Sequence, residues 1–382
     1  MRSRLNSLFD ALLPVLATLA ALAVGAVMLI ILRVSPVEAY GALWEGAFGS
    51  TNAIAETLVK SVPLLLVGLG ICIAFRASVI NIGAEGQMII GGLLATQIGI
   101  VFTDLPGWLV IVMAIFAGFL GGAIWGGIPG ALKAYFNVNE ILSTVMMNAI
   151  AVQIMNFMLR GPMIDPVQLE KASKIPQTAR LAEAFRLPRL APTRLHLGFI
   201  IAIALAILVY ILLWRTTLGY RIRAVGQNPH ASRYGGIRVR RRIVTALLLS
   251  GALAGIAGAI QVYGVNYRMI TDGSSTGFTG GAGFNGIVAA LFGQLHPIGT
   301  IPASIFFGAL LVGANKMQRA VQIPSALIGA LNGLVVIFVV GSEIWRRKRQ
   351  KVRLSAEDSE DENKSPPLEP DTSTDIPEEV IA

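Results

Sequence analysis

Long apolar runs recur along nearly the whole chain up to residue 345. The first covers residues 12–32, which are 21 positions without a charged side chain. A helix needs about 20 residues to cross the hydrocarbon core of a bilayer. The pattern therefore predicts an all-α, polytopic membrane helical bundle of about ten spans. The runs are 12–32, 61–75, 88–103, 107–135, 139–160, 196–214, 242–266, 283–294, 299–315 and 325–344.

Several runs are too short to cross a bilayer alone. Those at 61–75, 88–103 and 283–294 are predicted to be broken or re-entrant helices, whose freed backbone groups can line a cavity. Arg2 and Arg4 before the first run would also fit a secretory signal peptide. That run is too long for a typical signal core, and many more runs follow it.

The composition excludes a soluble protein and gives no sign of an enzyme. Hydrophobic residues make up 54% of the chain and charged residues 14%, against roughly 25% charged in soluble domains. The single cysteine, Cys72, excludes an internal disulfide, and three scattered histidines form no cluster, so no metal site is predicted. The HExxH, GxSxG and P-loop signatures are missing from the sequence, so we expect no ATP hydrolysis by this chain itself.

The charge distribution predicts the topology. The formal net charge of +9 would fit a nucleic-acid partner, but residues 355–382 hold 10 of the 22 acids and one base, so residues 1–354 carry +18. The bases gather before the first run, in loop 215–242 and in 346–353. Positively charged loops stay in the cytoplasm, so both termini are predicted to lie inside and segment 161–195 outside. The positive charge is thus explained by the topology, and no nucleic-acid partner is predicted.

Small residues recur at helical spacing in two of the predicted spans. Glycines four residues apart lie on one helix face and let helix backbones approach closely in lipid. A helix-packing role is therefore predicted for Gly118, Gly122, Gly126, Gly130, Gly251 and Gly255.

Three polar clusters interrupt the apolar runs, where polar groups call for a functional hypothesis. Asn81, Glu85 and Gln87 lie between two short runs. They either present amide and carboxylate groups to a cavity or belong to a connecting turn in which Glu85 pairs with Arg76. Asn148 lies mid-span, where it either makes an interhelical hydrogen bond or contacts something in a pathway.

The third cluster is the glycine-rich stretch before the short run at 283–294. Asn285 near the start of that run could face a ligand, and Phe284 could stack on one. His296, beyond its end, is interpreted as a satisfied interfacial residue rather than a proton carrier.

Loop 215–242 contains eight arginines and no acid. Asn228 is a good N-cap, Pro229 suits a first helical position, and Gly235 or Gly236 can end a helix, so a short exposed helix is predicted at about 229–234. Basic loops also bind lipid headgroups. A capped helix presented to the cytoplasm fits a protein partner better.

The loop resembles the cytoplasmic coupling segment of bacterial ABC importer permeases for simple sugars, nucleosides and branched-chain amino acids. The matching residues are Gly219–Gly226, Asn228–Pro229 and Gly236–Ile237, and the resemblance covers nearly all of residues 1–345. Phe75–Gln87 is similar to the second-span signature of that family. The nucleoside subgroup is resembled in particular at Glu140–Asn148, Leu159–Pro162, Gly283–Ile287 and His296–Gly299.

The resemblance implies a transport subunit, not an enzyme, that works by alternating access in the bacterial cytoplasmic membrane. It needs no cofactor of its own, because a cytoplasmic ABC ATPase uses the ATP. The implied partners are that ATPase, a second and different permease subunit, an extracytoplasmic BMP-type lipoprotein and membrane lipids. Nucleosides are the expected substrate. One alternative is a permease for simple sugars such as ribose or galactose. The other is an ion-coupled secondary transporter.

The resemblance to ABC importer permeases also implies roles for individual residues. The pathway is expected at Asn81, Glu85, Gln87, Asn148, Phe284 and Asn285, although family members commonly have aspartate where this chain has Asn285. ATPase coupling is expected at Arg223, Gly226, Asn228, Pro229, His230, Ala231, Arg233, Tyr234 and Gly236. The tail, 346–382, is basic and then acidic; its acidic part has no expected counterpart and is predicted to be disordered.

Overall fold

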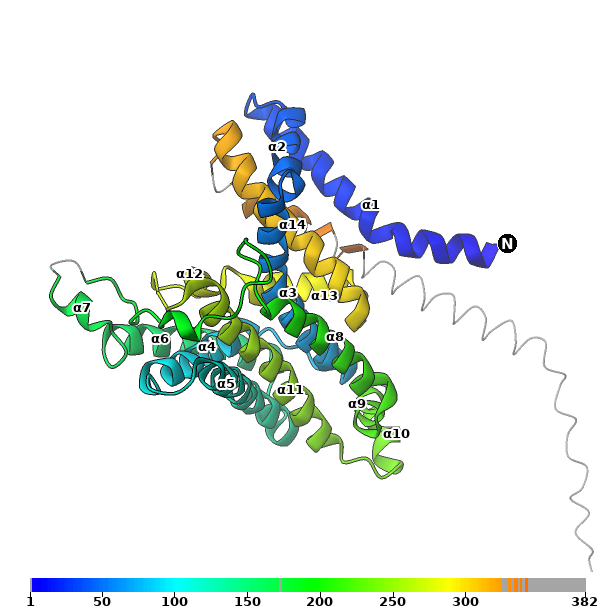
Figure 1. Cartoon of the computed structure of the whole chain (residues 1–382). Coiled ribbons are helices and arrows are strands. Elements are labelled where there is room, and N and C mark those ends of the chain that lie inside the picture. Colours follow the sequence, from blue (N-terminus) through cyan, green and yellow to red (C-terminus); the bar gives the residue numbers. More distant parts are fainter. Residues whose placement is uncertain are drawn as a thin grey trace, which may run out of the picture.

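The computed structural model describes residues 2–171 and 174–324, with parts of the last apolar run (327, 329–330, 333–335, 337–338 and 341–342). Nearly all of its regular structure is helical (Figure 1). The predicted tail, 346–382, lies outside the described residues. The helices before residue 180 are α1 (Arg2–Ile31), α2 (Pro36–Phe48), α3 (Thr51–Arg76), α4 (Ala84–Val101), α5 (Gly107–Phe136), α6 (Glu140–Arg160) and α7 (Pro166–Leu169).

The later helices include the element that carries the basic loop. They are η1 (Glu183–Phe185), α8 (Gly198–Arg215), α9 (Thr217–Gln227), α10 (Pro229–Tyr234), α11 (Val239–Ile260), its π-helical continuation η2 (Gln261–Asn266), α12 (Thr276–Thr279), α13 (Ala282–Phe292) and α14 (Pro297–Val321).

Seven described helices are long and apolar enough to cross a membrane, which confirms the predicted polytopic helical bundle. They are α3, α4, α5, α6, α8, α11 with η2, and α14. The apolar part of α1, Leu16–Ile31, is shorter, and α13 has only 11 residues. The run at 283–294 is therefore a short helix, as predicted.

The predictions of short or broken helices at 61–75 and 88–103 were wrong. The second run belongs to α4, a continuous helix of 18 residues that is long enough to span. The first run is the second half of α3, a continuous helix of 26 residues whose first turns carry Glu56 and Lys60. Ser50 starts the helix by accepting a hydrogen bond from the backbone N–H of Ala53 at 3.1 Å. The first half of α3 contains polar residues, so the pattern of apolar runs does not reveal it. Helix α2, which Ser35 caps, is not revealed by that pattern either.

Helix α11 packs against both α5 and α4 through backbone contacts, and α4 and α5 also pack on each other. Figure 1 shows the three helices next to one another. A Cβ atom added at Gly122 would overlap the carbonyl oxygen of Gly251, and one at Gly118 would lie 2.9 Å from the carbonyl oxygen of Gly255. On the α4 side, a Cβ atom at Gly91 would overlap Gly255. The helices can approach this closely only because these positions lack side chains.

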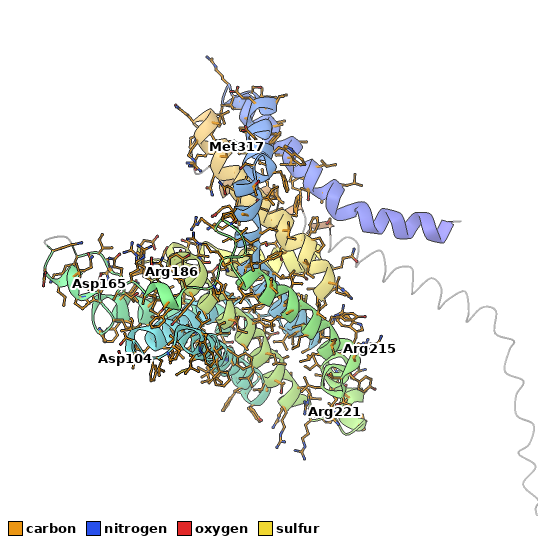
Figure 2. The ribbon with its side chains drawn as sticks, viewed as in Figure 1. Asp104, Asp165, Arg186, Arg215, Arg221 and Met317 are labelled. Carbon is orange, nitrogen blue, oxygen red and sulfur yellow. The ribbon has the colours of Figure 1, made fainter. Side chains whose placement is uncertain are left out.

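Two groups of polar residues mark opposite ends of the bundle. Figure 2 shows Asp165 and Arg186 at one end and Arg215 and Arg221 at the other. The sequence predicts that the first end is external and the second cytoplasmic.

Backbone hydrogen bonds tie segment 161–195 to the chain that follows α11. The backbone N–H of Leu181 donates to the carbonyl of Tyr267 at 2.8 Å, and that of Thr178 donates to Met269 at 2.9 Å. Between this segment and α8, burial lowers the pKa of His196 to about 4, so this imidazole is neutral near pH 7.

The contact between α5 and α11 predicts a large effect of one methyl group. Gly122→Ala should destabilise the protein by about 1–3 kcal/mol, because the opposing atom belongs to the backbone and cannot move aside. Gly41→Ala in α2 is the matched control, since a Cβ atom there meets nothing within 4 Å. Thermal unfolding of both variants in detergent measures the difference. Equal midpoints would contradict the proposed contact.

Candidate functional site

The loop between α3 and α4 enters the protein interior, where a buried amide holds it. The side-chain Nδ2 of Asn81 donates to Ser250 Oγ at 2.8 Å and to Gln87 Oε1 at 3.0 Å. Its Oδ1 accepts from the backbone N–H of Gly83 at 2.9 Å and from Gln87 Nε2 at 3.2 Å. Asn81 and Gln87 are thus fully engaged with the protein, and Asn81 links the loop to α11.

Glu85 joins α4 to the start of α13. Its side chain is fully buried, and its Oε1 accepts from the backbone N–H groups of Gly283 at 2.8 Å and Phe284 at 3.4 Å. Its Oε2 accepts from the hydroxyl of Thr279. These N–H groups belong to the first turn of α13, where a carboxylate also interacts favourably with the helix dipole.

The alternative of a turn closed by a pair between Glu85 and Arg76 is not what the structure shows. Arg76 instead donates to the carbonyl of Leu295 at 3.3 Å and lies over the ring of Trp214, 5.2 Å from its centroid. Glu85 and Arg76 therefore interact with different neighbours.

Asn148 of α6 makes the interhelical hydrogen bonds that were one of its two predicted roles. Its Oδ1 accepts from the backbone N–H of Gly86 at 2.8 Å, and its Nδ2 donates to the carbonyl of Ile82 at 2.9 Å. Gly86 lies in the first turn of α4, where backbone N–H groups lack a helical partner. Asn148 thus caps α4 from a neighbouring helix.

Phe284 differs from the other five predicted pathway residues in its exposure. Its side chain is 50% exposed, whereas those of Asn148 and Asn285 are half-buried and the other three are buried. Phe284 and Asn285 lie in the first turn of α13, where backbone N–H groups donate to Glu85. The structure therefore brings one exposed ring and one half-buried amide next to the buried network, and the pathway role of all six residues stays a prediction.

The short helix predicted in the basic loop is confirmed as α10. Asn228 caps it by accepting from the backbone N–H groups of His230 and Ala231, each at 3.0 Å. Gly235 ends the helix, and Gly236 follows with φ of +76°, a conformation that favours glycine. Tyr234 is 95% exposed. All of its side chains except the buried Ser232 are exposed, and its role in ATPase coupling stays a prediction.

The chain before α10 touches the loop between α3 and α4. Ser78 Oγ donates to the carbonyl of Gly226 at 2.5 Å, and a Cβ atom at Gly226 would overlap the carbonyl of Arg76. Nearby, Arg76 and Arg223 both lie over the ring of Trp214, with their guanidinium carbons 5.2 Å and 5.8 Å from its centroid. The basic loop is thereby connected to the loop that carries Asn81.

Comparison with known proteins decides the family. Residues 53–340 match the family described as branched-chain amino acid transport system / permease component. The chain belongs to this family. It is the permease component of an ABC transporter and a multi-pass membrane protein. No solved structure matches it significantly.

Three relatives align along most of this permease. It is 36% identical to the guanosine ABC transporter permease protein NupP of Bacillus subtilis, over 87% of this chain and 93% of the relative. It is 34% identical to the glucose ABC transporter permease protein TsgB13 of Haloferax volcanii, over 88% of each chain. It is 29% identical to the nucleoside ABC transporter permease protein NupB of Lactococcus lactis, over 87% of this chain and 92% of the relative.

A separate cavity of about 920 Å³ lies between α1, α13 and α14 of the permease. Its lining is mostly apolar and includes Phe292 and Phe306, with polar groups from Arg76, Gln294 and His296. None of the six predicted pathway residues is among the described residues that line it. The cavity and the first turn of α13 are therefore distinct places on the permease.

Sequence reasoning missed the partners that give the polar residues their geometry. Ser78, Ser250 and Thr279 each bond a predicted site residue, yet each lies in a stretch where a serine or threonine is unremarkable. Trp214 likewise gives no sign in the sequence that both Arg76 and Arg223 lie over its ring.

The role of Asn148 predicts a local and measurable defect. Asn148→Ala should destabilise the permease by about 1–3 kcal/mol, because it leaves the Gly86 N–H and the Ile82 carbonyl without their partners. Hydrogen exchange should speed up at the start of α4. Gln153→Ala, at an exposed position of the same helix, is the control. Unchanged exchange near Gly86 would contradict the capping role.

Proposed function

We propose that this permease imports nucleosides across the cytoplasmic membrane of a bacterium. The observation that carries the proposal is the alignment along nearly the whole length of relatives named for guanosine and for nucleosides. The resemblance of Glu140–Asn148 to the nucleoside subgroup supports the same substrate. A relative named for glucose, at 34% identity, makes a simple sugar the alternative.

The proposed assembly has two permease chains, a cytoplasmic ATPase and an extracytoplasmic lipoprotein of the BMP type. Two permeases from the same organism, NupP and NupQ, are both similar to this chain, at 36% and 30% identity. That pairing supports a partner permease that is a different chain. In the assembly, α10 docks on the ATPase.

The hydrogen bonds of the interior suggest how ATPase movement reaches the substrate. Displacement of α9 and α10 pulls on the α3–α4 loop through the bond between Ser78 and Gly226. The loop holds α11 through Asn81, and α4 holds the start of α13 through Glu85. Movement at the cytoplasmic end is thus passed to the first turn of α13.

The first turn of α13 offers the chemistry that a nucleoside needs. Phe284 presents an exposed ring on which a base can stack, and the amide of Asn285 can hydrogen-bond to ribose hydroxyls or base edges. Both groups lie directly beside the backbone that Glu85 fixes. In this proposal, alternating access opens and closes the space that they face.

Uptake by the assembled transporter tests the substrate. Proteoliposomes containing both permeases, the ATPase and the lipoprotein should take up labelled guanosine when ATP is enclosed. Unlabelled adenosine should compete, and excess glucose or ribose should not. Phe284→Ala should lower this uptake, because the stacking surface is lost. Uptake of pentoses or hexoses alone would refute the nucleoside proposal and favour the sugar alternative.

The link through Ser78 predicts a coupling defect. Ser78→Ala removes the hydroxyl that holds Gly226, and the loss of one hydrogen bond of about 1 kcal/mol should lower uptake per ATP hydrolysed roughly fivefold. Thr245→Ala is the matched control, because its hydroxyl also donates to a backbone carbonyl but only within α11. The measurement is uptake and ATP hydrolysis in the same vesicles. Equal ratios in the two variants would contradict this route.

A further inference from the structure

A cationic cleft lies beside the coupling helix. It has a volume of about 590 Å³ and is formed where the C-terminal part of α5 meets the turn between α10 and α11. One aromatic residue, Tyr135, lies on its α5 side, and Arg240 is placed over that ring, 5.8 Å from its centroid. Its four arginines are Arg233, Arg238, Arg240 and Arg241.

No acid within the described part of the chain neutralises this cleft. Its lining contains no carboxylate, and the four described ion pairs use Lys133, Arg186, Arg194 and Lys316 instead. Glu140, at the turn after α5, is already paired with Lys133 at 2.9 Å. Four like charges around one hollow repel one another, so the cleft favours an anionic occupant.

The permease carries a segment of matching charge at its own C-terminus. Residues 355–382 have a net charge of −9, and five of the six positions 357–362 are acidic. The basic residues of loop 215–242, which lines the cleft, and of 346–353, which precedes the acidic segment, predict that this tail and the cleft lie on the same side of the membrane. About 15 residues separate Ser342 from Glu357, and such a length of extended chain spans up to roughly 50 Å.

We propose that the acidic segment 357–362 binds in the arginine cleft of the same chain and competes with the ATPase for the coupling helix. The competition rests on the proposed function, whereas the binding does not. Arg233 belongs to α10 and Gly236 to the turn that follows it, and both line the cleft. A tail seated there covers one flank of the helix on which the ATPase docks.

Cysteine crosslinking tests the binding directly in the full-length chain. Ser359→Cys in the tail is combined with Tyr135→Cys in the cleft, and Cys72 can remain because it is fully buried. In nanodiscs of neutral lipid, mild oxidation should join this pair roughly tenfold faster than a control pair of Ser359→Cys with Tyr220→Cys. Tyr220 is exposed on α9 outside the cleft, and tethering raises the local concentration of the tail only at its binding site.

Salt and charge variants show whether the attraction is electrostatic. The faster rate should fall to that of the control at 1 M salt, where charges are screened beyond about 3 Å. It should also fall when the acids at 357–362 are replaced by their amides. Equal rates for the two pairs would overturn the binding, and would place the tail elsewhere, for example on its own basic stretch 346–353. A rate that is high in neutral lipid and abolished by anionic lipid would overturn it too, because lipid would then be the occupant.

Titration with the ATPase tests the competition. The permease with amides at 357–362 should reach half-maximal coupled ATP hydrolysis at a roughly fivefold lower ATPase concentration than the unmodified chain. An unchanged titration together with specific crosslinking would overturn the competition and leave the binding established. If the ATPase failed to bind either chain, the proposed function would fail, while the crosslinking result would still stand.

Discussion

Helices that begin inside a membrane protein must satisfy the N–H groups of their first turn without help from water. Among the described helices, α4 and α13 are in that position, and each receives its partner from another helix. Asn148 of α6 serves the start of α4, and Glu85 of α4 serves the start of α13. The need to satisfy these backbone N–H groups therefore fixes the relative positions of α4, α6 and α13.

The same requirement explains why polar residues lie where apolar ones would otherwise be expected. An isolated carboxylate in the interior would be strongly unfavourable, but Glu85 accepts hydrogen bonds from two backbone N–H groups and one hydroxyl. Asn81 is likewise satisfied at both ends of its amide. Because these groups are engaged with the protein, the proposed contact with a substrate falls on the exposed ring of Phe284 and the half-buried amide of Asn285.

The sequence predicts the elements of this permease better than their contacts. The length of the apolar runs predicts the helical bundle. The capping residues around Asn228 and Gly236 predict the bounds of α10, because both signals are local in the sequence. The extent of α3 was missed, since its first turns are polar. Asn148 was recognised as unusual from its position in an apolar helix. Its partners lie more than 60 residues away, and spacing along the chain carries no information about them.

The glycine contacts of α11 have a mechanical consequence. Side chains between two helices can change rotamer and let the helices slide, but backbone resting on backbone has no such freedom. Both α5 and α4 contact α11 in this way. These three helices are expected to move as one block during transport, so that the hinge between conformations falls outside them, at the junction with α13.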